Sequence, residues 1–553
     1  MMRSRDKGIP LKKSYTVWIY SIIVAIVLIV FVIVFTKEKT TRYSLETRTI
    51  QHIEDADANP NIGPTEVNPD GTVDPETFET HLPLFVIDTN GEEVPDIYDV
   101  LDTDTQERIF KDPEVTDPWI DVTMYIVDND NDVNKITDEP YFSNNGKIKL
   151  RGNSSRKFAK KQYGIKLLKK NGEELEYPLL GMDADEDWVL CNSILDASYL
   201  RSYVAYNIGG LLNPYTPEVR FCEVIRKNGD EYEYLGLYLL TESIKKSDGR
   251  VNIETYKGNT TNLSYIVDRD RFDQTTTMVP TYGSDSQICF GYFNLIYPKK
   301  DKADEATVKA IGDEISQIEK TLYSDDKKEF LEYSNYIDVD SFIDYFVYNE
   351  FMMNYDSGLH STYYYRDKSH KFSVGPFWDY DNCLDNYKLE AAGFDWMVMP
   401  SRPWYEQLVK DPLFDQKLVS RYKELRKSIL SDRFVEEFVM DADAYLGNAA
   451  LREHSRWGAT YEEECALFVS EVEGFDIDRT RKTQDEEVVR LLDAQKLHAD
   501  FLDDHMGNLL KDYIDEDLDT GSRKFFSAAA IVMMIIFVIA VYAVSKMSKG
   551  EIK

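Results

Sequence analysis

Two long apolar runs, one near each end of the chain, limit what this sequence can fold into. The run from Tyr15 to Phe35 carries no charged residue, and Phe525 to Val544 is a second run of 20 residues. About 20 helical residues cross a hydrocarbon core of about 30 Å. The first run is longer than the apolar part of a signal peptide, and no small-residue cleavage pattern follows it. We therefore predict transmembrane helices at 15–35 and 525–544, with a folded domain between them.

The charged flanks of the two runs predict their orientation. Basic residues gather in the tails at 1–14 and 545–553, namely Arg3, Arg5, Lys7, Lys12, Lys13, Lys546, Lys549 and Lys553. Because cytoplasmic flanks carry an excess of Lys and Arg, we expect both tails to be cytoplasmic and the main domain to be extracytoplasmic. Basic residues on the other side, such as Lys37 and Arg523, make this bias modest.

The charge and the composition exclude some classes of protein. The formal net charge is −35, which argues against a nucleic-acid binder because such a protein needs a basic face. The same charge favours either basic partners or simply a solvated acidic surface. The aromatic content of 13% suits a strand-rich fold and excludes a chain that is disordered as a whole.

The cysteines do not predict a disulfide scaffold or a zinc site. Five are scattered along the chain without a CxxC pair: Cys191, Cys222, Cys289, Cys383 and Cys465. Because their number is odd, at least one cannot pair within the chain. We expect buried free thiols.

The spacing of apolar residues divides the region between the two runs. Residues 37–78 are rich in Asp, Glu, Asn, Pro and Thr and are predicted to form a flexible acidic stalk. Strand patterns occur at 82–87, 119–127, 147–151, 163–167, 251–266, in a hairpin at 220–225 and 232–240, and in a second hairpin at 361–366 and 372–379. Helical spacing occurs at 197–212, 306–322, 340–353 and 405–513. The expected fold class is α+β, with one domain at 79–510 that has a strand-rich N-terminal part and a helical C-terminal part.

An acidic stretch is the main candidate for chemistry. Asp356 follows the predicted helix at 340–353, Ser361 lies five residues further on, and Asp379 and Asp381 end the second hairpin. Strand residues two apart point to the same face, so one metal ion could contact both of these last two acids. Magnesium takes one or two carboxylates together with substrate phosphates, and phosphoryl transfer needs an acid that orients the acceptor hydroxyl. The alternative is that these acids only cap a turn or face solvent.

A basic stretch is the expected counterpart. Arg151 begins an Arg-Gly-Asn-Ser-Ser turn that contains Ser154, and Lys160 and Lys161 follow it. Main-chain N–H groups of such a turn and a nearby cation could bind phosphates. Glu242 ends an apolar strand and could pair with a phosphate-binding lysine. The alternatives are a surface turn with exposed lysines and a strand that ends at solvent.

Taken in order, these motifs resemble the spore coat protein CotH kinase family. The resemblance covers about residues 80 to 505 and rests on Arg151–Ser155, Lys160-Lys161-x-Tyr163, Trp188–Leu190, Asp196 with Leu200-Arg201, Gly236–Tyr238 with Glu242, Asn349-Glu350 with Asp356, and Trp378–Asp381. It implies a diverged, protein-kinase-like fold that uses ATP and Mg, or Mn, to phosphorylate Ser or Thr in protein substrates.

The resemblance also implies roles for individual residues. Asp356 would be the catalytic acid, and Asp379 with Asp381 would be the metal ligands. Arg151, Lys161 and Glu242 would be the charges on the nucleotide side, and the choice between Lys160, Lys161 and Lys166 stays open. Ser361 stands near the position where the kinase pattern has an asparagine as a second metal ligand.

Two hypotheses follow. The first is a membrane-anchored protein kinase of the cell envelope or spore coat that acts on basic, Ser/Lys-rich proteins. The second is a non-catalytic cell-surface binding or envelope-assembly protein that retains the fold. The retained acids favour the first, whereas Ser361 and a domain that faces away from cytoplasmic ATP favour the second. A glycosidase with paired carboxylates has no support beyond the acids themselves.

Overall fold

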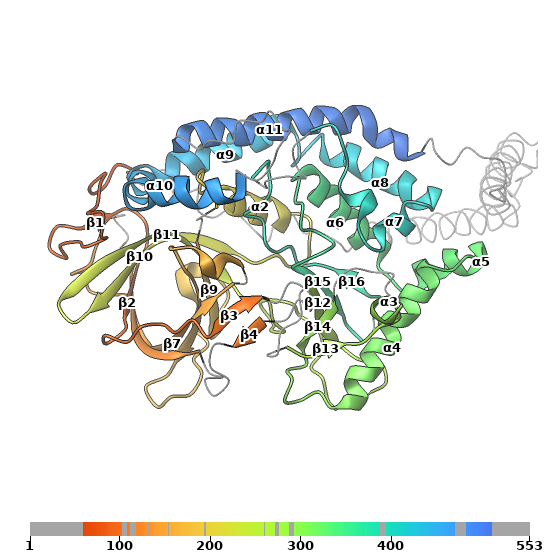
Figure 1. Cartoon of the computed structure of the whole chain (residues 1–553), viewed down its shortest axis with the longest axis horizontal. Coiled ribbons are helices and arrows are strands. Elements are labelled where there is room, and N and C mark those ends of the chain that lie inside the picture. The colour runs from red at the N-terminus through yellow and green to blue at the C-terminus, as the bar shows by residue number, and fades with distance from the viewer. Residues whose placement is uncertain are drawn as a thin grey trace, which may run out of the picture. The chain divides into compact units, whose positions relative to one another are not determined.

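A closed seven-stranded β-barrel forms the N-terminal part of the structure (Figure 1). The computed structural model describes residues 59–510, apart from 102–107, 111–117, 130–132, 153, 193–194, 259, 271–275, 287–291, 369, 387–393 and 470–482. These residues lie within one compact unit that spans residues 45–510. The predicted transmembrane helices at 15–35 and 525–544 and the tails at 1–14 and 545–553 lie outside the described residues.

The barrel closes through a parallel pair of strands. Its strands are β2 (Leu84–Asp88), β5 (Ile120–Val127), β7 (Phe142–Arg151), β8 (Gln162–Leu168), β9 (Asp187–Cys191), β10 (Val219–Asn228) and β11 (Glu231–Glu242). They follow the order β10-β11-β9-β8-β7-β5-β2, and every neighbouring pair within this order is antiparallel. The seam is the parallel pairing of β10 with β2, where Glu223 lies opposite Leu84.

Local sequence explains why these segments form strands. In β5 the residues at 120, 122, 124 and 126 are buried, and Asp121 between them is exposed, which is the alternation of a half-buried strand. The hairpin of β10 and β11 turns at Gly229-Asp230, between the paired residues Asn228 and Glu231, and Gly229 has φ +60°. Glycine is preferred at the first of the two residues of such a tight turn, so the predicted hairpin is confirmed with its turn one residue later than Asn228-Gly229.

A second, five-stranded sheet lies beside the barrel. It has the order β13-β14-β12-β15-β16, with β12 at Tyr265–Asp270, β13 at Met278–Val279, β14 at Tyr292–Tyr297, β15 at Thr362–Arg366 and β16 at Ser373–Val374. Val267 packs into the main hydrophobic core, whereas Ile266 packs into a small cluster with Tyr363. Since alternate residues of a strand face opposite sides, Asp268 and Asp270 lie on the same face as Ile266.

The helices form the rest of the structure and cover the main core. They are α2 (Arg201–Gly210), α3 (Tyr282–Asp285), α4 (Glu305–Leu322), α5 (Lys327–Phe330), α6 (Val339–Phe351), α7 (Tyr405–Leu408), α8 (Pro412–Leu425), α9 (Asp432–Leu446), α10 (Asn448–Val469) and α11 (Gln484–His505). Figure 1 shows α9, α10 and α11 along one side, and α11 contacts both α9 and α6. The α+β class with a strand-rich N-terminal part and a helical C-terminal part is confirmed. Among the helices of the described residues, none combines the length and the apolar character that a membrane span requires.

The described end of the predicted stalk is docked against the domain. Of the stalk at 37–78, residues 37–58 lie outside the described residues, whereas residues 59–78 contact the barrel and α10. Arg452 of α10 donates hydrogen bonds to the carbonyls of Ile62 at 3.1 Å and Pro64 at 2.7 Å, and Phe78 is buried. The domain therefore begins further towards the N-terminus than the predicted boundary at residue 79.

The cysteines that the structure describes are free thiols. Cys191 is partly buried, and Cys222 and Cys383 are buried. Burial raises the pKa of Cys191 to about 11 and the pKa of Cys383 well above its ordinary value. Thiols with raised pKa values hold little thiolate and react slowly, so these three residues serve as small core side chains.

Candidate active site

The first acid of the candidate site lies in a tight turn directly after α6. That helix is almost entirely buried, and the chain after it reverses through Met353, which has φ +51°. The N–H of His360 donates to the carbonyl of Asp356 at 2.9 Å, which closes the turn. The amide of Asn382 donates to the Asp356 carboxylate at 3.0 Å. The predicted position of Asp356 just past the helix end is confirmed, with its carboxylate turned towards the loop at 379–386.

The two later acids lie in a loop and do not end a strand. The predicted strand at 372–379 stops at Val374, and Asp379 has φ +66°, so the argument that strand alternation aligns Asp379 with Asp381 was wrong. The loop reaches the site because the N–H of Leu384 donates to the carbonyl of Met352 at 2.8 Å, at the end of α6. A residue without a partner strand is free to adopt a positive φ, which strand geometry forbids.

The three acids influence one another strongly. Burial, reinforced by the charge of Asp356, raises the pKa of Asp379 to about 6. Burial and the charges of Asp379 and Asp356 raise the pKa of Asp381 well above its ordinary value. Like charges held together disfavour ionisation, which adds to the effect of burial.

A fourth acid, Asp270, belongs to the same site and was not predicted. The Ser361 hydroxyl lies 3.0 Å from Asp379 Oδ2 and 3.2 Å from Asp270 Oδ2, and a hydroxyl has only one proton to donate. His360 Nδ1 lies 3.7 Å from Asp270 Oδ1. The strand predicted at 251–266 is displaced to 265–270, which puts Asp270 at its end. We call Asp270, Asp356, Ser361, Asp379 and Asp381 the acidic centre.

Arg151 brings positive charge to the acidic centre from the barrel. It ends β7, its guanidinium carbon lies 4.8 Å from the centre of the Trp378 ring, and its charge lowers the pKa of Asp379 against the larger effect of burial. Tyr206 of α2 accepts a hydrogen bond from the N–H of Asp379 at 3.2 Å. Arg151 Nη1 is buried and has no hydrogen-bond partner among the described residues. A buried, unsatisfied guanidinium N–H is a donor suited to a phosphate oxygen.

The lysines that the sequence analysis assigned to the nucleotide side are engaged elsewhere. Lys160 Nζ lies 2.6 Å from Glu453 Oε1 of α10 and 2.6 Å from the carbonyl of Leu237, and neither side chain of this ion pair is exposed. Lys161 donates to the carbonyl of Arg156 at 2.6 Å. Ser154 begins a short 3-10 helix at Ser154–Lys157, and its side chain lies outside what the structure describes.

Glu242 has a partner other than a lysine. Its carboxylate accepts the N–H of Glu218 at 3.0 Å and lies 3.9 Å from Arg250 Nε, and the residue is 1% exposed. The expected pairing of Glu242 with a phosphate-binding lysine is therefore absent from the described contacts. Of the predicted residues, the structure brings Arg151, Asp356, Ser361, Asp379 and Asp381 together and holds Lys160 and Glu242 in internal ion pairs.

The donor chemistry of the acidic centre suits a hard divalent cation. Carboxylate and hydroxyl oxygens are ligands of Mg and Mn, and magnesium uses few protein carboxylates when phosphates supply further oxygens. Within the described residues, the one group of three potential ligands whose atoms lie within 4.8 Å of one another is Asp185, Glu186 and Asp187. Lys245 lies 3.1, 2.6 and 2.9 Å from these three carboxylates. Lys166 also lies 2.8 Å from Asp187, and Arg250 Nε lies 3.7 Å from Asp185, so three cations contact this group of three carboxylates.

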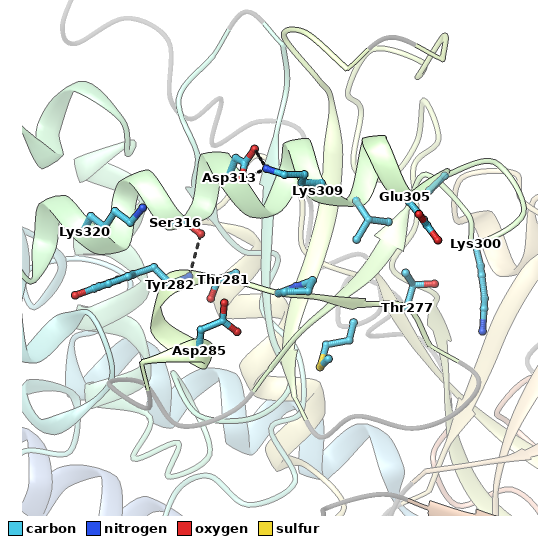
Figure 2. Close-up of a pocket in the computed structure, with 14 residues that line it drawn as sticks. Thr277, Thr281, Tyr282, Asp285, Lys300, Glu305, Lys309, Asp313, Ser316 and Lys320 are labelled. Atoms are coloured by element: carbon cyan, nitrogen blue, oxygen red, sulfur yellow. Dashed lines mark hydrogen bonds and ion pairs between the residues drawn. The ribbon is translucent and has the colours of Figure 1, made fainter.

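A surface hollow of about 910 Å³ lies apart from the acidic centre. Figure 2 shows that residues of β13, α3 and α4 line it, among them Tyr282, whose N–H donates to Ser316 Oγ at 2.9 Å. The Lys309 and Asp313 side chains pair with each other beside it at 2.6 Å. No residue of the acidic centre lines this hollow, so its size does not mark it as the reaction site.

Comparison with known proteins identifies the family. The model of the family described as CotH kinase protein matches residues 148–493, which is more than half of the chain and includes the whole acidic centre and Arg151. A search among curated proteins found no match. The chain therefore belongs to the CotH kinase protein family.

Proposed function

We propose that the protein is a membrane-anchored atypical protein kinase that transfers the γ-phosphate of ATP to Ser or Thr of protein substrates. The observation that carries this proposal is the acidic centre itself, where acids from two loops and one strand meet opposite Arg151. Membership of a kinase family supports the reaction class. A site between a strand-rich part and a helical part also suits a nucleotide that both parts contact.

The residues of the acidic centre have distinct roles in this proposal. Asp356, in its closed turn, accepts the hydrogen bond of the acceptor hydroxyl and takes its proton as the phosphoryl group is transferred. Asp379 and Asp381 would hold Mg or Mn, which when bound supplies positive charge beside the phosphates. Arg151 donates to a phosphate oxygen through the N–H that has no other partner among the described residues. Ser361 keeps the Asp379 carboxylate in one orientation.

The proposed location rests on the sequence. The apolar runs at 15–35 and 525–544 are long enough to cross a bilayer, and the basic tails favour cytoplasmic ends. The domain between them would then act on the extracytoplasmic side, in the cell envelope. A net charge of −35 favours basic, Ser/Lys-rich protein substrates through electrostatic attraction.

A second function is favoured by two specific observations. Ser361 stands near the position where the kinase pattern has an asparagine as a second metal ligand, and Lys160 and Glu453 form an ion pair in which neither side chain is exposed. A protein that kept the fold and lost nucleotide chemistry would show both features. The alternative is therefore a non-catalytic surface protein that binds partners or assembles the envelope.

The test uses the full-length protein in detergent micelles with γ-labelled ATP, Mg or Mn, and both casein and a Lys/Ser-rich polypeptide as acceptors. Label transfer or autophosphorylation that is lost in Asp356→Asn, and kept in the exposed control Asp313→Asn, supports the kinase. The absence of transfer, together with no ATP-dependent rise in melting temperature, rejects it and favours the binding protein.

A further inference from the structure

We propose that Asn349, Glu350 and Arg402 are positioning residues that together fix the separation of Asp356 from Asp379. We call these three residues the positioning frame. None of them belongs to the acidic centre, and all three are buried. The inference rests on the proposed function, because it concerns the geometry of the same site. It assigns a task to the Asn349-Glu350 motif, which that function leaves without one.

Asn349 contacts the loops of both acids with a single side chain. Its Oδ1 accepts hydrogen bonds from the Tyr380 hydroxyl at 2.8 Å and from Asn354 Nδ2 at 3.2 Å. Its Nδ2 donates to the carbonyl of Tyr345 at 2.9 Å, which fixes the orientation of the amide. Tyr380 directly follows Asp379, and Asn354 lies two residues before Asp356. One buried amide thus joins the two acidic loops.

Asn354 adds a direct link between the loops. Its N–H donates to the carbonyl of Asn349 at 3.0 Å, and its side-chain amide also lies 3.3 Å from the carbonyl of Asp379. The first bond joins the end of α6 to the loop of Asp356, and the second joins that loop to the loop of Asp379. Because α6 is buried along most of its length, its end is a fixed point from which both loops are held.

Glu350, the next residue of α6, holds a third segment. Its two carboxylate oxygens accept the N–H groups of Val398 at 2.9 Å and Met399 at 2.7 Å. Glu350 is fully buried, and charge-assisted hydrogen bonds to main-chain N–H groups satisfy its oxygens. This carboxylate therefore fixes the start of the segment that leads to Arg402.

Arg402 covers the turn that carries Asp356. It is 6% exposed, its guanidinium carbon lies 4.5 Å from the centre of the Tyr355 ring, and it donates a hydrogen bond to the Tyr355 carbonyl. Its side chain also fills the space beside Gly358, where an added Cβ would come within 2.9 Å of Arg402 Cβ. The charge of Arg402 is attracted to that of Asp356. Arg402 thus holds the turn through Tyr355 and Gly358, while the Asp356 carboxylate accepts its hydrogen bond from Asn382.

The acidic centre needs such a frame because its members repel one another. Carboxylates that are brought into one site repel one another when they are ionised, so loops without an anchor would relax apart. Hydrogen bonds are directional, so those of the positioning frame fix the positions of the two acidic loops, whereas apolar packing alone would let the loops slide past each other. A displacement of about 1 Å costs a reaction of this kind about 100-fold in rate.

The experiment compares Asn349→Ala, Arg402→Met and Arg402→Lys in the full-length protein. The matched control is Arg421→Met, which removes an arginine that binds α6 itself, through Asp344 at 2.7 Å, on a part of the helix away from the acids. We expect kcat to fall about 30- to 100-fold in the first two variants, with KM for ATP within about threefold of the wild type. The kcat of Arg402→Lys should be at least about tenfold higher than that of Arg402→Met. Arg421→Met should keep the wild-type kcat.

Hydrogen–deuterium exchange provides a readout that does not depend on activity. Asn349→Ala should speed exchange in both 354–361 and 379–386, because its amide contacts both loops, whereas Arg402→Met should speed exchange in 354–361 alone. Unchanged exchange in both loops, or kcat within about threefold of the wild type in both variants, overturns the frame. If the wild-type protein transfers no phosphate, the proposed function fails, and the exchange pattern still decides the positioning role. If Asn349→Ala does not fold, Asn349→Ser takes its place.

Discussion

Two groups of acids in this molecule differ in how their charge is neutralised. Asp185, Glu186 and Asp187 lie around Lys245, within 3.1 Å in every case, so this lysine-bound cluster is satisfied by the protein itself. The acidic centre has Arg151 beside it, and burial, reinforced by neighbouring carboxylates, raises the pKa values of Asp379 and Asp381. The denser cluster thus serves stability, and the less compensated one is ready for a ligand.

The largest effect that separates the two groups concerns activity. We expect Asp356→Asn to lower kcat about 1,000-fold, because the acceptor hydroxyl loses the group that orients it and takes its proton. Asp187→Asn, in the lysine-bound cluster, should leave kcat within about twofold. Steady-state assays with labelled ATP measure both. Equal losses in the two variants would contradict the division between the groups.

The next effect concerns the stability of the lysine-bound cluster. Lys245→Met removes the lysine that contacts all three carboxylates and leaves Lys166 beside Asp187 and Arg250 beside Asp185. It should lower the free energy of unfolding by about 3 kcal/mol, the low end for a broken buried ion pair, since Lys245 is 20% exposed. Burial alone would lower the pKa of Lys245, but its three acidic partners raise it. This contribution is therefore complete below the unfolded pKa of lysine and is lost as pH rises through the higher folded pKa.

Urea unfolding at pH 7 of Lys245→Met beside the wild type measures this loss. A variant as stable as the wild type would show that the cluster does not need its lysine. Its kcat, scaled to the folded fraction, should match the wild type, because Lys245 contacts no residue of the acidic centre in the described ion pairs.

A smaller change in the free energy of unfolding, a gain and not a loss, is expected when Asp379 of the acidic centre is replaced. The folded pKa of Asp379 is about 6, above its unfolded value, so the folded protein binds this proton more tightly. The stability that this proton contributes is complete below the unfolded pKa and is lost as pH rises through about 6. In metal-free protein, Asp379→Asn should therefore be more stable than the wild type at pH 8, by on the order of 2 kcal/mol. The gain should shrink towards pH 4.

Urea unfolding in the presence of EDTA, at pH 4, 6 and 8, measures that difference. Magnesium should reduce the gap at pH 8, because a cation bound to the wild type relieves the same repulsion. A gap that is constant with pH would mean that Asp379 is not held among like charges.

The smallest effect concerns Ser361. Ser361→Ala removes the hydroxyl between Asp270 and Asp379, and its hydrogen bond is one of the contacts that lower the pKa of Asp379. We expect kcat to fall about fivefold to tenfold and the acidic limb of the pH–rate profile to move to higher pH, as for the loss of one hydrogen bond. Asp270→Asn should move the same limb to lower pH. Shifts in the same direction would contradict the geometry of this pair.

Local patterns were enough to predict most of the elements. The apolar spacing in α6, the glycine of the hairpin turn and the helical C-terminal part all reflect neighbours within a few residues of each other. The acids at 356, 379 and 381 were also found, although the strand argument for the last two was wrong. In their loop Asp379 has a positive φ, and no apolar pattern reveals such a backbone angle.

Contacts between distant residues were not predictable from the same patterns. Lys160 looked like a phosphate ligand because its partner Glu453 lies 293 residues away in sequence. Asp270 was missed because only the sheet brings it to Ser361, and residues 59–78 looked like a stalk because the arginine that binds them is on α10. A polar residue can be assigned to solvent, a ligand or an ion pair only when its partner is known.

The seam of the barrel has a consequence of simple parity. Strands that alternate in direction around a closed ring must be even in number, so a ring of seven contains at least one parallel pair, and here it is β2 with β10. The first barrel strand in chain order, β2, therefore completes its pairing only with the sixth, β10. While the chain emerges from the ribosome, β2 has one open edge until residue 228 has been made, and the barrel cannot close before about two fifths of the protein exists.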